Sequence, residues 1–262
     1  MEPYTFTDGT SPLLISVPHV GTHIPDDLKA RMTDLADETP DTDWHVDRLY
    51  DFAPAMGAAM LVASHSRFVI DLNRPADDAS LYPGQDVEGL CPLKSGDYRE
   101  VYQAGQEPSA AEIDQRRQTY WQPYHDRLAE ALAAIKERHG FALLWDAHSI
   151  KSEIPRFFDG KLWDLNLGTG GGKTCDDDLS ARIMEVADEA AGFTSILNGR
   201  FVGGFITRNY GRPADDIHAI QLELSWATYM DETPPYGYRE DLAASIRPVL
   251  QRFVQTMLAF RA

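Results

Sequence analysis

The sequence predicts an α/β protein with a mixed, mostly parallel β-sheet flanked by helices. Short apolar runs of strand length alternate with longer stretches of helical periodicity along all 262 residues. Residues 141–145 are almost continuously apolar, as expected for a parallel strand that is buried on both faces. Neither an internal repeat nor a low-complexity linker interrupts this alternation, so residues 1–262 are expected to form a single domain.

The expected strands are short and apolar. In chain order they cover residues 12–17, 59–63, 67–72, 141–145, 194–197, 204–207 and 218–225. The expected helices cover residues 43–56, 110–138, 177–191 and 240–260, with a bend in the second of them at Pro123. Residues 75–98, which are rich in Pro, Gly and Asp, and residues 149–175 are expected to be long loops that act as lids or binding segments.

The composition limits the possible partners. A formal net charge of −17 argues against nucleic-acid binding, which needs a concentrated basic surface. A membrane span is not expected, because no run of about 18 apolar residues is present. The N-terminus lacks the basic and apolar segments of a secretory signal, and two cysteines do not suggest a disulfide framework. The sequence therefore favours a cytoplasmic protein, and it leaves the oligomeric state open.

Four apolar runs end at, or contain, polar residues of a kind found in active sites. His19 follows the first run, Asn73 and Arg74 follow the run at 68–70, His148 follows the run at 141–145, and Glu223 lies within the last. Open α/β sheets gather their active-site groups at the carboxyl ends of the strands. If these runs are neighbouring strands, their polar residues meet in one crevice. This set of side chains indicates a zinc hydrolase that acts on an anionic substrate.

His19 and His148 are the expected histidine ligands. A catalytic zinc ion takes three protein ligands, typically from His, Asp and Glu, and leaves a fourth position for water. A histidine ligand usually has an acceptor for its second nitrogen, and Asp146, two residues before His148, is a candidate for that role. The third ligand should therefore be a carboxylate from another element.

Asp43 is the expected carboxylate ligand, with Asp47 as the alternative. The two acids are four residues apart at the start of an expected helix and so share one of its faces. There is also a purely structural explanation for Asp43 and Asp47. Acids are common in the first turn of a helix, because they oppose the helix dipole. His23 and His45 compete for similar roles.

Glu223, in the last expected strand, is the other notable acid. Because side chains alternate along a strand, Glu223 shares a face with Gln221 and Ser225, while the aliphatic residues pack on the other face. A charge buried in such an apolar stretch needs a partner, such as a metal-bound water or an arginine. The alternative is an edge strand on which Glu223 is solvated.

Arginines supply the positive charge that an acidic protein needs to bind an anion. Four of them lie at or just beyond expected strand ends, namely Arg67, Arg74, Arg208 and Arg212. Each can also be an ordinary surface arginine in a loop. A glycine-rich stretch at 168–174 looks like a phosphate-binding loop, but Leu167 stands where the Walker pattern needs glycine and no clear strand is expected before it. We interpret it as a flexible loop.

The ordered set of motifs resembles the N-formylglutamate amidohydrolases, or N-formylglutamate deformylases. These enzymes release formate from N-formyl-L-glutamate at the end of one histidine-degradation route. The matching segments are SVPHVGT (16–22), DTDWHVDRLY (41–50), SRFVIDLNRP (66–75), LYPG (81–84), WDAHS (145–149), GGFITR (203–208) and QLELS (221–225). Each motif is weak alone, but together they span roughly residues 10–230 in order.

The resemblance implies a fold similar to that of zinc-dependent exopeptidases. It also implies a zinc ion held by two histidines and a carboxylate, with a glutamate on a late strand as general base. These roles fall on His19, His148, Asp43 (or Asp47) and Glu223. Asn73 and Arg74 look like the counterpart of the exopeptidase Asn-Arg pair that grips the substrate carboxylate. Thr22, and not Glu, stands three residues after His19, so the carboxylate ligand departs from the exopeptidase pattern.

The implied reaction is the zinc-dependent hydrolysis of N-formyl-L-glutamate to formate and L-glutamate. Arg67 or Arg208 would stabilise the oxyanion, and Asn73, Arg74 and Arg212 would bind this small anionic N-acyl amino acid. A site with two histidines and one carboxylate also accepts cobalt and other divalent metals. The alternatives are a related metal-dependent amidohydrolase for another N-acyl amino acid and a non-catalytic binding protein of the same fold.

Overall fold

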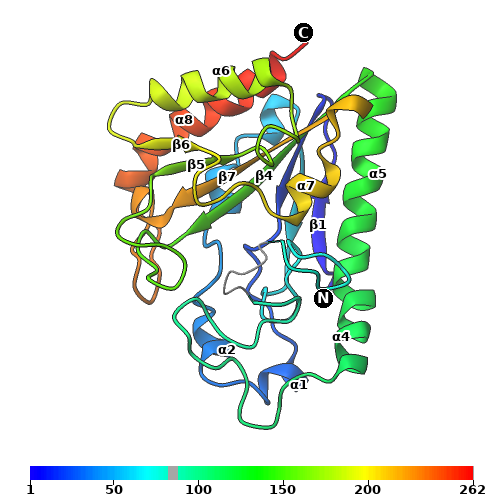
Figure 1. Cartoon of the computed structure of the whole chain (residues 1–262), viewed down its shortest axis with the longest axis vertical. Helices are drawn as coiled ribbons and strands as arrows, with labels where there is room; N and C mark the ends of the chain where they lie inside the picture. The colour runs from blue at the N-terminus through cyan, green and yellow to red at the C-terminus, as the bar shows by residue number, and fades with distance from the viewer. Residues whose placement is uncertain (82–87, 262) are drawn as a thin grey trace.

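The computed structural model describes residues 1–81 and 88–261, and a mixed β-sheet forms its centre (Figure 1). Its strands are β1 (Tyr4–Thr7), β2 (Leu13–Val17), β3 (Ala59–Ala63), β4 (Ala142–Ile150), β5 (Leu165–Gly168), β6 (Ser195–Leu197) and β7 (Ile217–Ser225). They lie in the order β1-β3-β2-β4-β7-β5-β6. The pairs β1–β3 and β5–β7 are antiparallel and the other pairs are parallel. The predicted fold class is therefore confirmed.

Helices cover both faces of the sheet. The longer ones are α4 (Ala110–Arg116), α5 (Gln122–His139), α6 (Asp177–Asp188) and α8 (Glu240–Leu258). The remaining ones are α1 (Asp26–Lys29), α2 (Leu35–Glu38), α3 (Val46–Leu49) and α7 (Phe205–Tyr210), with short 3₁₀ turns at Pro54–Met56, Pro213–Asp215 and Trp226–Thr228. In Figure 1, α6 and α8 lie over one face, and α5 lies on the other. Each face thus has its own buried apolar cluster.

A third apolar cluster lies beyond the sheet, where α1 and α2 form the lower part of Figure 1. Leu28 and Leu35 of these helices pack there with Phe68, Val69 and Tyr102. Because this cluster supports the chain around residue 70, it stabilises a segment that contributes directly to the cavity described below. No helix in the described part of the chain is both long and apolar enough to cross a membrane.

Two expected strands are wrong. Residues 67–72 form turns, because both sides of β3 are already occupied by β1 and β2. Residues 204–207 begin helix α7, in which the Arg208 N–H donates to the Gly204 carbonyl. The β-branched and aromatic residues of this stretch favour a strand by propensity, but packing of Ile206 in the α5-side core outweighs that preference.

The expected helix at 43–56 is largely absent. His45 has a left-handed backbone (φ 62°), so α3 begins only after it, and Pro54 has no N–H with which to continue a helix. Two short strands, β1 and β5, were not expected. The expected loop at 149–175 therefore contains β5. Residues 82–87 of the expected loop at 75–98, which include most of the LYPG motif, lie outside the described residues.

The glycine-rich stretch follows strand β5, contrary to expectation, yet it forms no cradle for a phosphate group. Its N–H groups are already bonded within the protein. Gly170 donates to Val202, Gly171 to the Asn198 side chain, and Lys173 to the Thr169 carbonyl. A phosphate-binding loop instead turns its N–H groups toward the ligand. The interpretation against an ATP site agrees with this geometry.

Candidate active site

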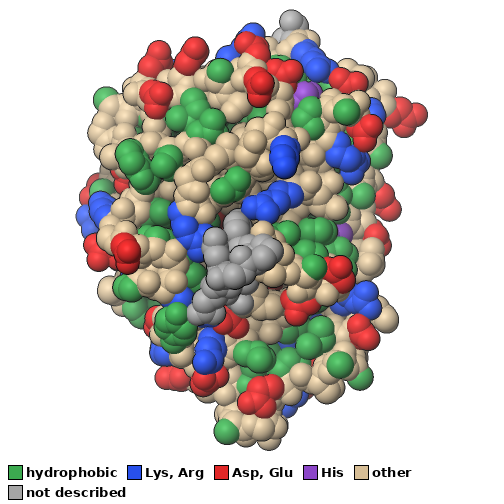
Figure 2. Space-filling view, viewed as in Figure 1, with side chains coloured by type: hydrophobic (Ala, Val, Ile, Leu, Met, Phe, Trp, Pro, Cys, Tyr) green, Lys and Arg blue, Asp and Glu red, His purple; other side chains and the backbone are tan. Residues whose placement is uncertain are grey.

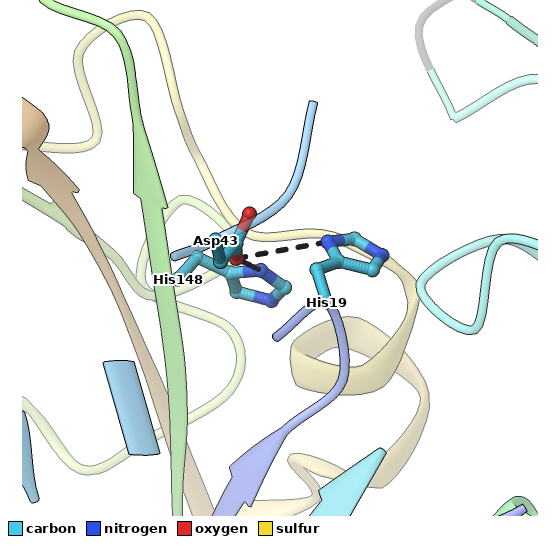
Figure 3. Close-up of side chains that lie close together, drawn as sticks. All are labelled: His19, Asp43 and His148. Atoms are coloured by element: carbon cyan, nitrogen blue, oxygen red, sulfur yellow. Dashed lines mark hydrogen bonds and ion pairs between the residues drawn. The ribbon is translucent and has the colours of Figure 1, made fainter. Parts of the chain in front are cut away.

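Three buried side chains meet at the carboxyl end of the central strands. His19 follows β2, His148 lies in β4, and Asp43 comes from the turn before α3. Asp43 Oδ2 lies 2.9 Å from His148 Nδ1 and 3.8 Å from His19 Nδ1, and Figure 3 shows it facing both rings. One ligand atom from each residue lies within 4.8 Å of the others. The cluster has the composition and spacing of a metal site.

Backbone hydrogen bonds set the position of Asp43. Its N–H donates to the His19 carbonyl at 2.9 Å, and its Oδ2 accepts the Ser149 N–H at 3.2 Å. The chain at residue 43 is thereby tied to both histidine-bearing segments. Asp47, the alternative ligand, is exposed on α3, whereas Asp43 is only 2% exposed. The geometry favours Asp43.

The outer nitrogen of each imidazole lies beside a carboxylate, and that of His148 also lies beside an amide donor. His19 Nε2 lies 2.7 Å from Asp71 Oδ1, and His148 Nε2 lies 3.2 Å from Asp146 Oδ2. Asn73 Nδ2 is a further neighbour of His148 Nε2 at 2.9 Å. Carboxylates that hold the outer nitrogen of a histidine are typical of metal sites, because they orient the ring and leave the inner nitrogen free to ligate. The two Nδ1 atoms and the Asp43 carboxylate therefore fit a divalent cation.

Burial and charge shape the protonation of this cluster. Burial lowers the pKa of His19, and Arg67 lowers it further. Burial also lowers the pKa of His148, but Asp146 and Asp43 outweigh it and raise the pKa well above its usual value. Burial would raise the pKa of Asp71, yet Arg67 and His19 hold it well below its usual range. A charged Asp71 beside His19 keeps that ring oriented.

Glu223 faces the same cavity from β7. Its Cα pairs with that of His148 on β4, so the two side chains leave the sheet side by side. Burial raises the pKa of Glu223 to about 8, with Asp43 raising it and His148 lowering it. Gln221 Nε2 donates to it at 3.4 Å. β7 lies between β4 and β5, so the alternative of a solvated edge strand does not hold.

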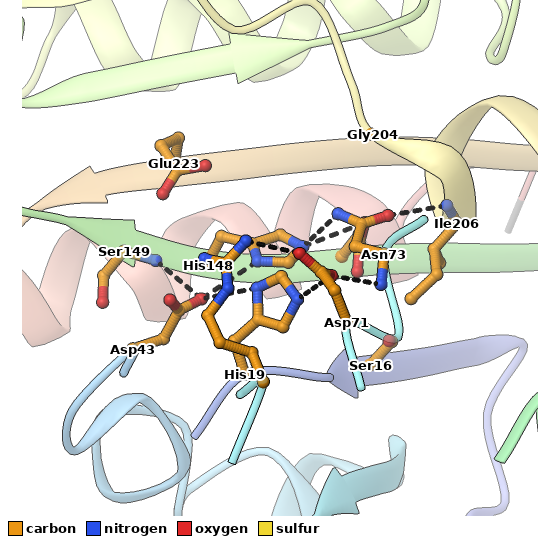
Figure 4. A network of polar contacts seen from close by, with 12 residues as sticks. Ser16, His19, Asp43, Asp71, Asn73, His148, Ser149, Gly204, Ile206 and Glu223 are labelled. Carbon is orange, nitrogen blue, oxygen red and sulfur yellow. Dashed lines mark hydrogen bonds and ion pairs between the residues drawn. The ribbon is translucent and has the colours of Figure 1, made fainter. Parts of the chain in front are cut away.

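Figure 4 shows how these residues surround the two imidazoles. Asp71 and Asn73 lie on one side of the rings, and Asp43 and Ser149 lie on the other. Asn73 Oδ1 accepts the Ile206 N–H at 2.8 Å, so helix α7 rests against the site. A Cβ atom at Gly204 would lie 2.3 Å from Asn73 Nδ2, and only glycine permits this close approach.

A cavity of about 500 Å³ opens onto the cluster. Arg67 and Arg74 lie on its wall together with His19, Asp43 and His148, and both arginines pair with Asp71. Five further cations, which we call the cationic wall, line the cavity: Lys94, Arg99, Lys151, Arg156 and Arg200. Figure 2 shows Lys and Arg side chains gathered near the middle of one face, with Asp and Glu mostly toward its edge. The cavity lining thus brings basic and acidic side chains together, with Asp41, Glu88 and Glu153 among the acids.

The other predicted arginines lie apart from the cavity lining. Arg208, on α7, donates to the Leu81 carbonyl at 3.1 Å. Arg212 follows α7, and its side chain is half-exposed and paired with Asp215. We therefore do not place Arg212 among the substrate contacts.

Sequence reasoning missed two contributors to the site. Asp71 was passed over although it stands directly after an apolar run and two residues before Asn73, which is a usable signal. Arg156 carries no such signal, because it lies in a long irregular segment. Its side chain is 2% exposed, donates to the Ser95 carbonyl at 2.8 Å and pairs with Glu88.

The fold and the site together define a mixed-sheet α/β protein with a buried His–Asp–His cluster of metal-ligand type. The family model for N-formylglutamate amidohydrolase matches residues 11–230, and the chain belongs to that family. It is accordingly a hydrolase of carbon–nitrogen amide bonds.

Named relatives support this assignment. An N-formylglutamate deformylase of Pseudomonas putida is 49% identical over 98% of this chain and 96% of its own length. One from Pseudomonas aeruginosa is 48% identical over 99% of this chain and 97% of its own. The crystal structure of an N-formylglutamate amidohydrolase from Ralstonia eutropha superposes with a TM-score of 0.83, at 26% identity, with 98% of each chain covered.

Proposed function

We propose that this protein hydrolyses N-formyl-L-glutamate to formate and L-glutamate with the help of a zinc ion. The observation that carries the proposal is that the His19–Asp43–His148 cluster, Glu223 and several arginines line one cavity. The names of the two Pseudomonas relatives support the substrate. We also propose that the reaction closes one route of histidine degradation, as the family resemblance implies.

His19, Asp43 and His148 would hold the metal ion. When bound, a divalent ion of this kind supplies Lewis-acid chemistry, in that it activates water and polarises a carbonyl group. Zinc suits a donor set of two imidazoles and one carboxylate, and cobalt is an alternative. The positive charge of a bound metal ion favours the charged form of a neighbouring acid. It would therefore lower the pKa of Glu223, so that its carboxylate can act as a base at neutral pH.

Glu223 would act first as general base and then as general acid. Its carboxylate takes a proton from the attacking water as the water oxygen bonds to the formyl carbon. It returns that proton to the amide nitrogen as the carbon–nitrogen bond breaks. The remaining hydroxyl proton of the adduct passes to the departing amine, so formate and glutamate with a protonated amine leave. Arg67, which is anchored by Asp71 at 2.6 Å and lines the cavity, is the cation that we assign to the oxyanion. Arg208 lies apart from the cavity lining, and we do not assign it this role.

The two carboxylates of the substrate would bind to the arginines of the cavity. Asn73 contacts His148 and Arg74 lines the same cavity, and we assign the α-carboxylate to them. The side-chain carboxylate would then reach the cationic wall. Arg156 is the most suitable member, because its guanidinium is buried and is held over the Tyr98 ring at 4.4 Å. A fixed arginine selects a carboxylate by direction as well as charge.

A metal analysis combined with a formate-release assay tests this proposal. We expect one zinc ion per chain and release of formate from N-formylglutamate. N-acetylglutamate and succinylglutamate serve as matched controls for the acyl group, and N-formylaspartate serves for the side-chain length. Faster hydrolysis of one of these would assign the protein to a related amidohydrolase activity. Absence of hydrolysis by the metal-loaded protein would contradict the proposal.

A further inference from the structure

The segment Val69 to Arg74 carries side chains on which the site depends, yet it belongs to no strand. Asp71 holds His19, and Asn73 and Arg74 line the cavity. A buried backbone without strand partners still needs donors for its carbonyl groups. The donors that this segment uses therefore determine how firmly its side chains are placed.

Three of these carbonyls accept hydrogen bonds from side chains of a single helical rod. Arg116 Nη1 donates to the Val69 carbonyl at 3.1 Å, and Trp121 Nε1 donates to the Arg74 carbonyl at 2.9 Å. His125 Nε2 lies 2.8 Å from the Leu72 carbonyl. The Leu72 and Arg74 carbonyls flank Asn73, so the backbone is held on both sides of that residue.

A π-helical turn in the rod brings the three donors to one side. The rod consists of α4, the π turn Arg117–Trp121 and α5. In a regular α-helix, side chains five residues apart point about 140° away from each other, because five residues span roughly 500° of rotation. The wider π turn brings positions five apart, such as Arg116 and Trp121, close to alignment. His125 follows Trp121 by four residues and so shares its face.

Stacking fixes the two ring donors. The Trp121 and His125 rings stack with centroids 3.8 Å apart, and Phe205 of α7 packs edge-on against His125 at 5.5 Å. Burial lowers the pKa of His125 to about 4, so the ring is neutral at physiological pH. A neutral ring that bonds to a carbonyl through Nε2 must carry its hydrogen there. The tautomer of His125 is thus set for donation.

We propose that Trp121 and His125 are positioning residues, brought into line by the π turn, which hold the Leu72 and Arg74 carbonyls and thereby orient Asn73 and Arg74 for substrate binding. They act through the backbone and lie behind the segment, and they do not line the cavity. The kinetic part of this inference rests on the proposed hydrolysis of N-formylglutamate. The structural part, restraint of residues 69–75, does not.

Three variants test the inference. His125→Phe keeps a stacked ring but loses the donor, and His125→Gln restores an N–H near the position of Nε2. Trp121→Phe removes the indole donor and keeps an aromatic ring. Tyr124→Phe is the matched control, because it removes a buried polar group, the Tyr124 hydroxyl, from the same helix. The partners of that hydroxyl, Ser16 and Leu61, lie on the sheet and not in the segment.

Two readouts are measured for each variant: steady-state kinetics with N-formylglutamate and backbone hydrogen exchange of residues 69–75. We expect His125→Phe and Trp121→Phe to raise KM about tenfold, to change kcat less than about threefold and to accelerate exchange in that segment. His125→Gln should return both KM and the exchange rate most of the way to their wild-type values. If His125→Phe does not fold, Trp121→Phe and His125→Gln carry the test.

Equal KM and exchange changes in Tyr124→Phe would overturn the inference, because the effect would then be general destabilisation. Unchanged exchange at 69–75 in both ring variants would overturn it as well. If the wild-type protein itself does not hydrolyse N-formylglutamate, the proposed function fails, but the exchange measurement still decides whether the two rings restrain the segment.

Discussion

The two sides of the cavity are built in different ways. The side with the His–Asp–His cluster takes His19, His148 and Glu223 from the central strands or directly beyond them, where neighbouring backbones fix their spacing. Asp43 reaches it from the turn before α3. The cationic wall comes from loop segments, and Arg156 and Arg99 are held there mainly by acids and carbonyl groups. The comparison shows that the sheet positions most of the cluster side, whereas loops position the cationic wall.

Removal of a ligand should have the largest effect. His148→Ala should lose its metal ion and lower kcat/KM on the order of a thousandfold, because the Lewis acid that activates water is lost. Metal content by mass spectrometry and formate release measure the two effects. His139→Ala, on the last turn of α5, is the control and should retain both. A His148→Ala protein that keeps one metal ion per chain would place the metal elsewhere.

Glu223→Gln should separate metal binding from catalysis. The amide is nearly the same size as the carboxyl group but cannot take a proton from water. We therefore expect kcat to fall about a hundredfold or more while metal content stays at the wild-type level. Near-normal turnover would remove Glu223 from its assigned role.

Asp71→Asn tests the outer support of the cluster. The change removes the charge that orients His19 and anchors Arg67. We expect metal affinity to weaken by about 10–100-fold, which a competition titration with a chelator can measure. Asp146→Asn, beside the imidazole of His148, should also weaken metal affinity. Unchanged affinity in both would show that the outer carboxylates do not support the ligands.

On the substrate-binding side, Arg74→Ala should act mainly on KM. Loss of one arginine–carboxylate contact is expected to raise KM for N-formylglutamate about tenfold and to leave metal content unchanged. Arg74→Lys should recover only part of the loss, because an ammonium group lacks the planar fork. Arg212→Ala provides the comparison, and KM should stay close to wild type because Arg212 pairs with Asp215 outside the cavity lining.

The smallest expected effect concerns stability. Burial raises the pKa of Asp41, in the cavity, from 3.8 to about 6, with Arg67 and Arg156 opposing the shift. Because the folded pKa exceeds the unfolded one, the contribution of Asp41 to stability is complete below pH 3.8 and is lost as the pH rises through 6. Asp41→Asn keeps an acceptor for the Gly96 N–H. Relative to wild type, its stability should rise by ~1–3 kcal/mol between pH 4 and pH 8.

Chemical denaturation at the two pH values measures this difference. A stability difference between Asp41→Asn and wild type that does not change with pH would mean that Asp41 titrates normally in the folded protein. Asp71, which Arg67 and His19 hold in its charged form, should show the opposite trend when it is replaced by Asn, since its contribution is lost as the pH falls.

The same contrast explains what the sequence could reveal. His19, His148 and Glu223 were found because hydrophobic runs mark strands and the ends of parallel strands converge. The sequence does not reveal the positions of Arg156 and α7, because they depend on tertiary packing that no local pattern records. The chain around Val69 has the composition of a strand, but β1 and β2 already occupy the edges of β3 and the segment turns to the helical rod for its hydrogen bonds.

The central claim is that one metal ion binds to His19, Asp43 and His148. Anomalous X-ray scattering at the zinc absorption edge, measured on crystals of the zinc-loaded protein, tests it most directly. We expect one strong anomalous peak at bonding distance from the Nδ1 atoms of both histidines and from the Asp43 carboxylate. A zinc peak at another position, or none at these three residues, would contradict it.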